Sequence, residues 1–325
     1  MTINRRDFLL AGAAGLLASS LPTLPTSAQA DPPPLRLGII GSDNSHAEAF
    51  AALLNKDQDP NGRHVPGAKI THICGERSER TQYIAETYEI PHIVASPEDM
   101  MDQVDGVLCL WRHGSRHVDM APFLARGMPM FIDKPFTTRV EDAQKLLDAA
   151  EQGNTVLTSF SCLRYEPGFV EFASGIRDPD EKILGGWLCG PADRNSEYDG
   201  IFAYGVHTVE MLLTLWGEVP ASVYAQGEAG MVHTFCRFTD GRRISLLWVE
   251  KGKAAFQAAV FGEKRMRYVE VKTDALYYEG LKVILEMFRR RVMPLSPKQL
   301  LEPVRLLCAI QTSLQTQAPV SLANV

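Results

Sequence analysis

The order in which apolar and amphipathic segments follow one another is the strongest constraint on the fold. Between residues 35 and 133, short apolar runs alternate with segments whose apolar residues recur at helical spacing. Strand and helix repeated in this way predict a parallel sheet covered by helices. The apolar runs cover 35–41, 69–75, 106–111 and 129–133, and the helical segments cover 47–54, 80–88 and 118–125.

The pattern changes after residue 160, where apolar runs follow one another with no helix between them. Thr239-Asp240-Gly241 is a hairpin signal between two of these runs. Consecutive strands joined by tight turns predict an antiparallel sheet, and two amphipathic helices close the chain. The runs cover 221–226, 232–238, 244–250 and 254–261, and the helices cover 275–291 and 297–315.

The length of 325 residues makes two domains the default expectation. We expect residues 31–160 to form an α/β domain around the parallel sheet. Residues 161–325 are expected to form an α+β domain that ends in the two helices.

The first thirty residues predict export. Arg5-Arg6 precede a weakly apolar run that ends near Ala18, and Ser27-Ala28-Gln29-Ala30 has the form of a cleavage site. Paired arginines are the mark of a twin-arginine signal, and the run is too short to span a bilayer. We therefore expect the twin-arginine translocase to carry the folded chain to the periplasm.

The charge of the chain argues against two classes of partner. Cleavage after Ala30 removes two arginines and one aspartate, so that the formal net charge moves from -6 to -7. An acidic chain favours neither nucleic acid nor an anionic membrane surface. We expect no nucleic-acid partner, and no membrane association once the signal is removed.

Six cysteines are scattered along the chain without paired spacing. A twin-arginine substrate folds in the reducing cytoplasm, where disulfides are rare, and most of these residues stand in apolar runs. We predict buried free thiols and no structural disulfide. The cysteines are Cys74, Cys109, Cys162, Cys189, Cys236 and Cys308.

The first apolar run leads into a degenerate glycine loop. A dinucleotide-binding fold sets its pyrophosphate at this place, against a helix N-terminus. Only Gly41 remains of G-x-G-x-x-G, because Asp43 and His46 take the places of the other two glycines. A carboxylate repels a pyrophosphate, so this motif alone is weak evidence. The ribose-binding acid after the second run is replaced by Gly75, and Glu76 is the candidate to substitute for it.

Three further motifs, together, resemble the glucose-fructose oxidoreductase, inositol dehydrogenase and rhizopine-catabolism family (Gfo/Idh/MocA). They are Asp133-Lys134-Pro135 after the run that ends at 133, Arg164-Tyr165-Glu166-Pro167, and the segment from Tyr204 to Glu210. The resemblance covers nearly the whole chain after residue 30. It implies a Rossmann domain followed by a mixed sheet, NAD or NADP as cofactor, and self-association through the second sheet.

The resemblance also implies roles for individual residues. Lys134 would contact the cofactor ribose and a substrate hydroxyl, and its bond to Pro135 is a candidate cis peptide. His207 would be the general base that takes the hydroxyl proton. Substrate-binding residues would be Arg164, Tyr204 and His117; cofactor-binding residues would be Gly41, Ser42, Asp43, Asn44, Glu76, Asp133 and Lys134.

Two departures from the family pattern weaken these implied roles. Family members commonly place an aspartate four residues before the histidine, and this chain has Ala203. The usual Pro-Asn pair at the end of the run 106–111 is missing at Trp111-Arg112-His113, although His117 matches the family's histidine. The charged set around Lys134 and His207 is therefore incomplete.

Three functions remain open from the sequence. The first is a periplasmic NAD(P)-dependent oxidoreductase of a sugar, polyol or related hydroxy compound, loaded with cofactor before export. The second is a lyase or hydrolase that has lost nucleotide binding and uses Asp43, His46 and His117 as acid and base. The third is a non-catalytic binding protein. We predict no metal site, because no histidine pair has ligand spacing.

Overall fold

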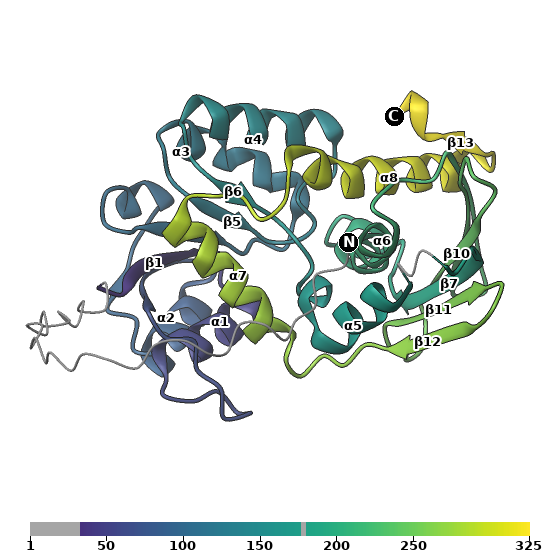
Figure 1. The fold of residues 1–325 in the computed structure, drawn as a ribbon. Coiled ribbons are helices and arrows are strands. Elements are labelled where there is room, and N and C mark those ends of the chain that lie inside the picture. Colours follow the sequence, from purple (N-terminus) through teal and green to yellow (C-terminus); the bar gives the residue numbers. More distant parts are fainter. Residues whose placement is uncertain (1–32, 177–179) are drawn as a thin grey trace, which may run out of the picture. The chain divides into compact units, whose positions relative to one another are not determined.

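The computed structural model describes residues 33–176 and 180–325 (Figure 1). The expected twin-arginine signal and its cleavage site lie outside the described residues. In the described part no helix is both long and apolar enough to cross a membrane.

A six-stranded sheet forms the first half of the described chain, with the strand order β3-β2-β1-β4-β5-β6. All five neighbouring pairs are parallel, which confirms the expected parallel sheet. The order reverses between β1 and β4, and ligands of such sheets bind beyond the carboxyl ends of the strands at that point. The strands are β1 (Leu35–Ile40), β2 (Ala68–Cys74), β3 (His92–Ile93), β4 (Gly106–Cys109), β5 (Met130–Ile132) and β6 (Leu157–Thr158).

Helices connect these strands, as the alternation predicted. Residues 118–125 are the exception, because they divide into a 3-10 turn and a short α-helix. Pro122 stands in the first turn of that helix, where its missing N–H is tolerated. The helices are α1 (Ser45–Asn55), α2 (Ser78–Thr87), η1 (Pro97–Met100), η2 (Gly114–Met120), α3 (Ala121–Ala125) and α4 (Val140–Gln152).

A seven-stranded sheet forms the second half, with the strand order β12-β11-β7-β10-β9-β8-β13. The expected hairpin at Thr239–Gly241 joins β9 to β10, which pair antiparallel. The sheet is mixed rather than antiparallel throughout, because β7 pairs parallel with β10. The strands are β7 (Ile183–Pro191), β8 (Ser222–Glu228), β9 (Met231–Arg237), β10 (Arg243–Val249), β11 (Gln257–Gly262), β12 (Met266–Glu270) and β13 (Val320–Ser321).

The parallel strand β7 escaped the sequence interpretation because glycines interrupt its apolar pattern. A side chain at Gly185 would clash with the carbonyl oxygen of Arg243, and one at Gly186 would clash with that of Ala259. Glycine therefore allows β7 to lie between β10 and β11 at close range. Because glycine is uncommon in strands, the same residues weaken the sequence pattern from which a strand is predicted.

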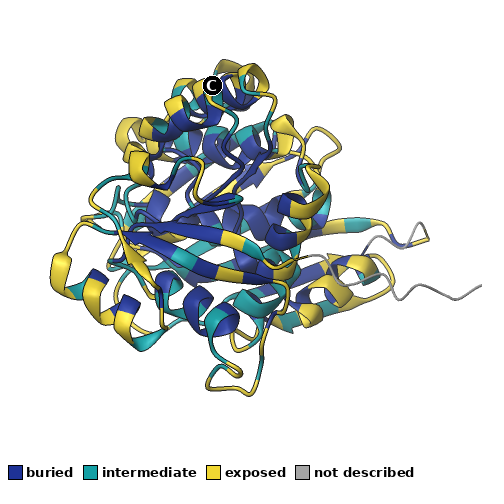
Figure 2. Cartoon of the chain, turned by 90° about the vertical axis from the view of Figure 1, so that its left-hand side faces the viewer, coloured by how far each residue is buried: buried dark blue, intermediate teal, exposed yellow. Residues whose placement is uncertain are grey.

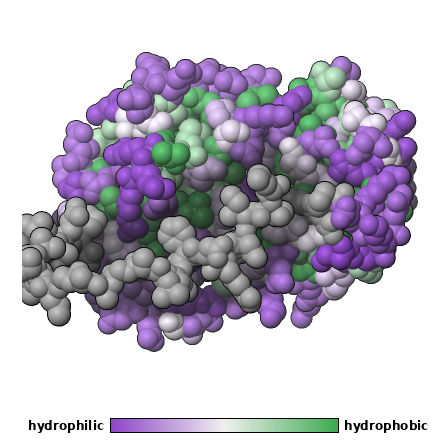
Figure 3. Space-filling view, in the orientation of Figure 1, coloured by the Kyte–Doolittle hydropathy of each residue, from purple (hydrophilic) through white to green (hydrophobic). Residues whose placement is uncertain are grey.

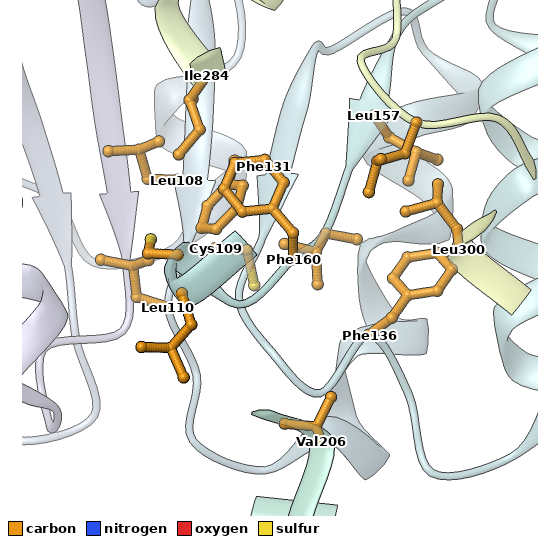
Figure 4. Close-up of a cluster of buried hydrophobic side chains, with 14 of the residues drawn as sticks. Leu108, Cys109, Leu110, Phe131, Phe136, Leu157, Phe160, Val206, Ile284 and Leu300 are labelled. Atoms are coloured by element: carbon orange, nitrogen blue, oxygen red, sulfur yellow. The ribbon is translucent and has the colours of Figure 1, made fainter. Parts of the chain in front are cut away.

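Two C-terminal helices join the halves of the described chain. Helix α7 (Leu276–Arg290) packs beside α1, and α8 (Pro297–Thr316) packs against α4, α6 and β8. Figure 4 shows Ile284 of α7 above Leu108 of β4, and Leu300 of α8 beside Phe136. The remaining helices are η3 (Cys162–Tyr165), α5 (Pro167–Ile176), α6 (Phe202–Trp216) and η4 (Leu322–Asn324).

One hydrophobic cluster extends through both sheets and the helices between them. Figure 2 shows the buried residues in the interior and the exposed ones on the outer faces of the helices, and hydrophilic side chains predominate on the face in Figure 3. The six cysteines are free thiols, four of them buried.

Candidate active site

Two cavities lie beyond the carboxyl ends of β1, β4 and β5. The first, of about 250 Å³, is lined by the loop before α1 together with Arg112 and Tyr198, and we call it the loop cavity. The second, of about 240 Å³, is lined by His207, Ser161 and Tyr277, and we call it the His207 cavity. The two cavities share five lining residues, which are Ser45, His46, Asp133, Lys134 and Tyr204. These residues therefore face one continuous region of the sheet edge.

Gly41 makes the tight turn that leads out of β1. Its φ is +96°, and a Cβ there would come within 2.9 Å of the backbone of Leu110 and Trp111. Only glycine fits this position. Its amide donates to the carbonyl of Cys74 at 2.8 Å, which fixes the turn at the end of β2.

The side chain of Asn44 caps helix α1. Its Oδ1 accepts from the amides of His46 at 2.7 Å and Ala47 at 3.1 Å, so it satisfies two of the donors that a helix N-terminus leaves open. Its Nδ2 donates to the carbonyl of Leu110 and lies 3.5 Å from Asp133 Oδ2. Asn44 therefore ties α1 to the ends of β4 and β5.

Asp43 contributes a poorly compensated carboxylate to the loop. Its Oδ1 is buried and has no hydrogen-bond partner, and Arg77 Nε lies 4.0 Å away. A buried oxygen without a donor is unfavourable. An anion bound beside Asp43 would therefore need additional positive charge.

Gly75 and Glu76 directly follow β2. A side chain at Gly75 would clash with the hydroxyls of Ser42 and Thr81, which lie 2.9 Å apart in the interior. Glu76 accepts from the Ser42 amide at 3.4 Å and pairs with Arg116 at 3.4 Å. Glu76 is thus the acid that stands beside the glycine loop.

Asp133 and His46 are in contact in the middle of the site. His46 Nδ1 lies 2.7 Å from Asp133 Oδ2, with side chains 14% and 5% exposed. Burial alone would raise the pKa of the Asp133 carboxyl, but His46 and Lys134 outweigh it and hold that pKa below its usual value. Asp133 therefore stays ionised.

Lys134 lies between the two cavities. Its Nζ donates to the carbonyl of Ala203 at 3.0 Å and lies 5.0 Å from the centre of the Tyr204 ring. Burial lowers the pKa of the Lys134 ammonium, and the charge of Asp133 opposes this change. The peptide bond from Lys134 to Pro135 is cis, as the sequence predicted.

His207 faces the second cavity from α6. Its Nδ1 lies 2.7 Å from Ser161 Oγ, and its ring packs against Tyr204 and Phe256. Burial, followed by the charges of Lys134 and His46, lowers the pKa of His207 well below its usual value. The imidazole is therefore neutral at physiological pH.

Two residues to which the resemblance gave substrate contacts lie outside these cavities. His117 is fully buried, with its ring nitrogens 2.9 Å from the Pro135 carbonyl and 3.0 Å from the Trp111 carbonyl. Arg164 pairs with Glu210 through two contacts of 3.3 Å. Both side chains hold backbone segments together, and neither lines the shared region.

Sequence reasoning did not assign roles to Ser161, Arg112 or Tyr277. The guanidinium carbon of Arg112 lies 3.4 Å from the centre of the Tyr198 ring, and the Tyr277 ring lies 4.9 Å from the His46 ring. Ser161 and Arg112 follow strand ends, a position that could have drawn attention to them. Tyr277 arrives on α7 from the end of the chain, and no local signal indicates its place.

Comparison with known proteins identifies a family model and proteins that share this fold. Residues 35–160 match the family model Gfo/Idh/MocA, described as an oxidoreductase family with an NAD-binding Rossmann fold. The inositol 2-dehydrogenase/D-chiro-inositol 3-dehydrogenase of Halalkalibacterium halodurans is 22% identical over 274 residues, which cover 79% of this chain and 74% of that protein. The UDP-N-acetylglucosamine 3-dehydrogenase of Acidithiobacillus ferrooxidans is 22% identical over 200 residues, 61% of this chain and 59% of its own.

Solved structures share the fold at low sequence identity. The myo-inositol 2-dehydrogenase from Lactobacillus plantarum superposes with a TM-score of 0.77 at 14% identity, over 89% of this chain and 99% of that one. The scyllo-inositol dehydrogenase from Lactobacillus casei, solved with bound NAD(H) and scyllo-inositol, has a TM-score of 0.77 at 11% identity, with the same coverage.

Proposed function

Because this chain belongs to the Gfo/Idh/MocA family of NAD-binding oxidoreductases, we propose that it oxidises a hydroxyl group of a sugar, polyol or related compound with NAD or NADP as hydride acceptor. The observation that carries the proposal is the placement of Lys134 and His207 on one cavity at the carboxyl edge of the first sheet. A lysine and a neutral imidazole are the groups that this reaction needs beside the hydroxyl.

The residues around the glycine loop fit a nicotinamide nucleotide. Gly41 makes the tight turn that leads from β1 toward α1, and the first turn of α1 has the positive end of the helix dipole. Glu76 lies where it can accept from a ribose hydroxyl. We place the nucleotide along Gly41, Ser42, Asn44 and Glu76, with its reactive ring toward Asp133 and Lys134. The bound cofactor would take a hydride from the substrate carbon.

Asp43 sets a limit on how tightly the loop holds a pyrophosphate. Its carboxylate repels the phosphates, and Asn44 already occupies two amides of the first turn. Arg77, near Asp43, supplies compensating charge. Nucleotide binding in this chain therefore depends on side chains outside the glycine motif.

The protein's own groups position the substrate hydroxyl. The Lys134 ammonium donates to the hydroxyl oxygen and stabilises the negative charge that develops there. His207 Nδ1 lies 2.7 Å from Ser161 Oγ. In the tautomer whose Nδ1 donates to that hydroxyl, Nε2 can accept a hydrogen bond from the substrate hydroxyl. Tyr204, which lines both cavities and is 47% exposed, is a candidate surface for the carbon ring of a polyol.

A spectrophotometric screen tests this function. Full-length protein is incubated with NAD⁺ or NADP⁺ and with myo-inositol, scyllo-inositol or UDP-N-acetylglucosamine, and reduced cofactor is followed by absorbance. We expect reduction with at least one polyol or sugar, and its loss in Lys134→Met. The proposal is wrong if no reduced cofactor forms and the protein does not bind either nucleotide.

We also propose that the chain is exported by the twin-arginine translocase and acts in the periplasm. Arg5-Arg6 and the Ala28–Ala30 site support this, and a route for folded proteins allows a cofactor to be bound before export. Fractionation of cells that express the full chain tests it. Arg5→Lys combined with Arg6→Lys should leave the protein in the cytoplasm, whereas unchanged export of that variant would exclude this route.

The open face of the second sheet supports self-association. Helices α5, α6 and α8 cover one face of this sheet, while large apolar side chains remain exposed on its strands. An exposed apolar sheet face of this kind is typical of a protein interface. The exposed residues on this face are Met231, Phe235, Phe261, Met266 and Tyr268.

A further inference from the structure

Two imidazoles flank Lys134, and they come from different parts of the chain. His207 lies on α6, and His46 lies in the first turn of α1, at the place of the third glycine of a dinucleotide loop. Both rings line the His207 cavity. Only His46 also lines the loop cavity. An oxidised hydroxyl must lose its proton, and a neutral imidazole is a group that can accept it.

His207 is poorly placed to keep a proton. Its Nδ1 contacts a hydroxyl, Ser161 Oγ, and Ala203 replaces the carboxylate one turn earlier on α6. The Ala203 carbonyl is occupied by Lys134 Nζ. Burial and the positive charge of Lys134 both disfavour a charged ring here, and they lower the pKa of His207. His207 therefore remains a neutral hydrogen-bonding group.

His46 has the carboxylate partner that His207 lacks. Asp133 Oδ2 lies 2.7 Å from His46 Nδ1, and the other oxygen, Oδ1, accepts from the Lys134 amide at 2.8 Å. A negative charge at this distance from Nδ1 stabilises the protonated form of the ring. This leaves Nε2 as the proton-accepting atom of His46.

The charged and titratable groups around His46 come from every neighbouring element. Phe50 and Tyr277 pack against its ring, and Tyr277 keeps its proton because burial raises its pKa. The groups are Asp43 in the loop, Arg112 after β4, Asp133 and Lys134 after β5, His207 on α6 and Tyr277 on α7. Among these groups Asp133 is the carboxylate that pairs with His46 in the described chain, at 2.7 Å from Nδ1.

We propose that His46, in contact with Asp133, takes the proton that leaves the substrate hydroxyl, in place of the carboxylate–imidazole pair that Ala203 breaks on α6. This rests on the proposed oxidation. The O–H bond breaks and its proton goes to His46 Nε2, while the C–H pair leaves as hydride to the oxidised nicotinamide. Asp133 stays ionised and stabilises the imidazolium, which then loses the proton to solvent through the loop cavity.

NMR of the full chain labelled with ¹⁵N-histidine tests which ring carries the proton. Signals of His46 and His207 are assigned by their loss in His46→Gln and His207→Gln. Between about pH 5 and about pH 9 we expect His207 to stay neutral. In Asp133→Asn the ¹⁵N signals of His46 should shift, because the ring loses the negative charge that faces its Nδ1, and those of His207 should change little. A titrating His207, or His46 signals that Asp133→Asn leaves unchanged, would overturn the proposal.

Nucleotide binding and turnover separate this proposal from the proposed function. NADH and NADPH are titrated by fluorescence into the wild type and His46→Gln, and kcat/KM with NAD(P)⁺ and the best polyol is measured against pH. We expect retained binding, a loss of about 10²-fold in kcat/KM and disappearance of the acidic limb of the profile. A variant that keeps this limb refutes the role of His46 and leaves the oxidation intact. If the wild type binds neither NADH nor NADPH, the proposed oxidation is wrong. The NMR measurement would then still show whether His207 stays neutral.

Discussion

The Nζ of Lys134 donates to the backbone carbonyl of Ala203 at 3.0 Å. Strand β5 and helix α6 are thereby joined at the point where the two cavities meet. The contact places the ammonium beside Tyr204 and in the same cavity as His207. Residue 203 contributes a main-chain oxygen here, which accepts a hydrogen bond but has no charge.

Removal of the Lys134 charge should disable the reaction without unfolding the protein. We expect Lys134→Met to lower kcat/KM by about 10²–10⁴-fold, because the oxyanion loses its donor. Lys145→Met is the matched control, since Lys145 is exposed on α4 and pairs only with Asp142 among the described residues. Steady-state kinetics and thermal unfolding of both variants check this. Equal activity of the two variants would remove Lys134 from the mechanism.

Gly41 should be irreplaceable because of its neighbours as well as its backbone angle. Gly41 and Gly241 have φ values of +96° and +97°, but only Gly41 has backbone atoms in the way of a Cβ. We expect Gly241→Ala to cost about 1–2 kcal/mol and Gly41→Ala to cost about 1–3 kcal/mol more. Urea unfolding measures both. Similar losses would show that the loop can move away from Leu110.

Acid should destabilise the fold partly through His207. The folded-state pKa of His207 lies well below its unfolded value, so the unfolded chain binds a proton first as pH falls. Below about pH 6.5 the free energy of unfolding should fall by about 1.4 kcal/mol per pH unit from this group. His207→Gln should remove this contribution, so that unfolding below this pH takes up about one proton fewer. Denaturant titrations at several pH values check it, and an unchanged slope would contradict a buried neutral His207.

Arg164 should act on stability through Glu210. Both side chains are buried, and burial raises the pKa of Glu210 against the charge of Arg164. Arg164→Met leaves a buried acid without its partner, at a cost of about 3–5 kcal/mol. Combination with Glu210→Gln should restore part of the loss. If the single variant is as stable as the wild type and loses only activity, Arg164 contacts the substrate instead.

The exposed face of the second sheet should hold copies of the chain together. Phe235→Asp introduces a charge at a side chain that is 46% exposed and outside the core, so it should dissociate an oligomer without unfolding it. Glu228→Asp, on the neighbouring strand β8, is the control. Sedimentation velocity distinguishes the species. A wild-type monomer at all concentrations would refute the interface.

The elements that are predicted from the sequence are those whose pattern is local. Strands β1, β2, β4 and β5 alternate with helices in a local pattern that needs no tertiary information, and Thr239-Asp240-Gly241 is a local turn signal. Strand β3 was not predicted, because it has only two residues. Strand β7 was missed because Gly185 and Gly186 interrupt its apolar pattern. Glycine is needed at both positions because the backbones of β10 and β11 lie too close for a side chain. Its parallel pairing with β10 depends on contacts that a linear pattern does not contain.

The residues of the candidate site likewise include some that local motifs predict and others that only the fold brings together. Lys134 and His207 could be named because motifs surround them, and both line the His207 cavity. His117 and Arg164 belong to equally clear motifs, but the side chains are bonded to backbone carbonyls and to Glu210. The contact of His46 with Asp133 joins the start of α1 to the end of β5, and only the fold brings them together.

Mass spectrometry of the intact protein, purified gently from the periplasm under native conditions, tests the central claim most directly. An oxidoreductase exported with its cofactor should carry one NAD(H) or NADP(H) per chain, which denaturation releases for identification. Asp43→Gly should bind the same nucleotide at least as tightly, because a carboxylate beside the pyrophosphate is removed. A native protein with no nucleotide, which also fails to bind NADH or NADPH when they are added, would contradict the account.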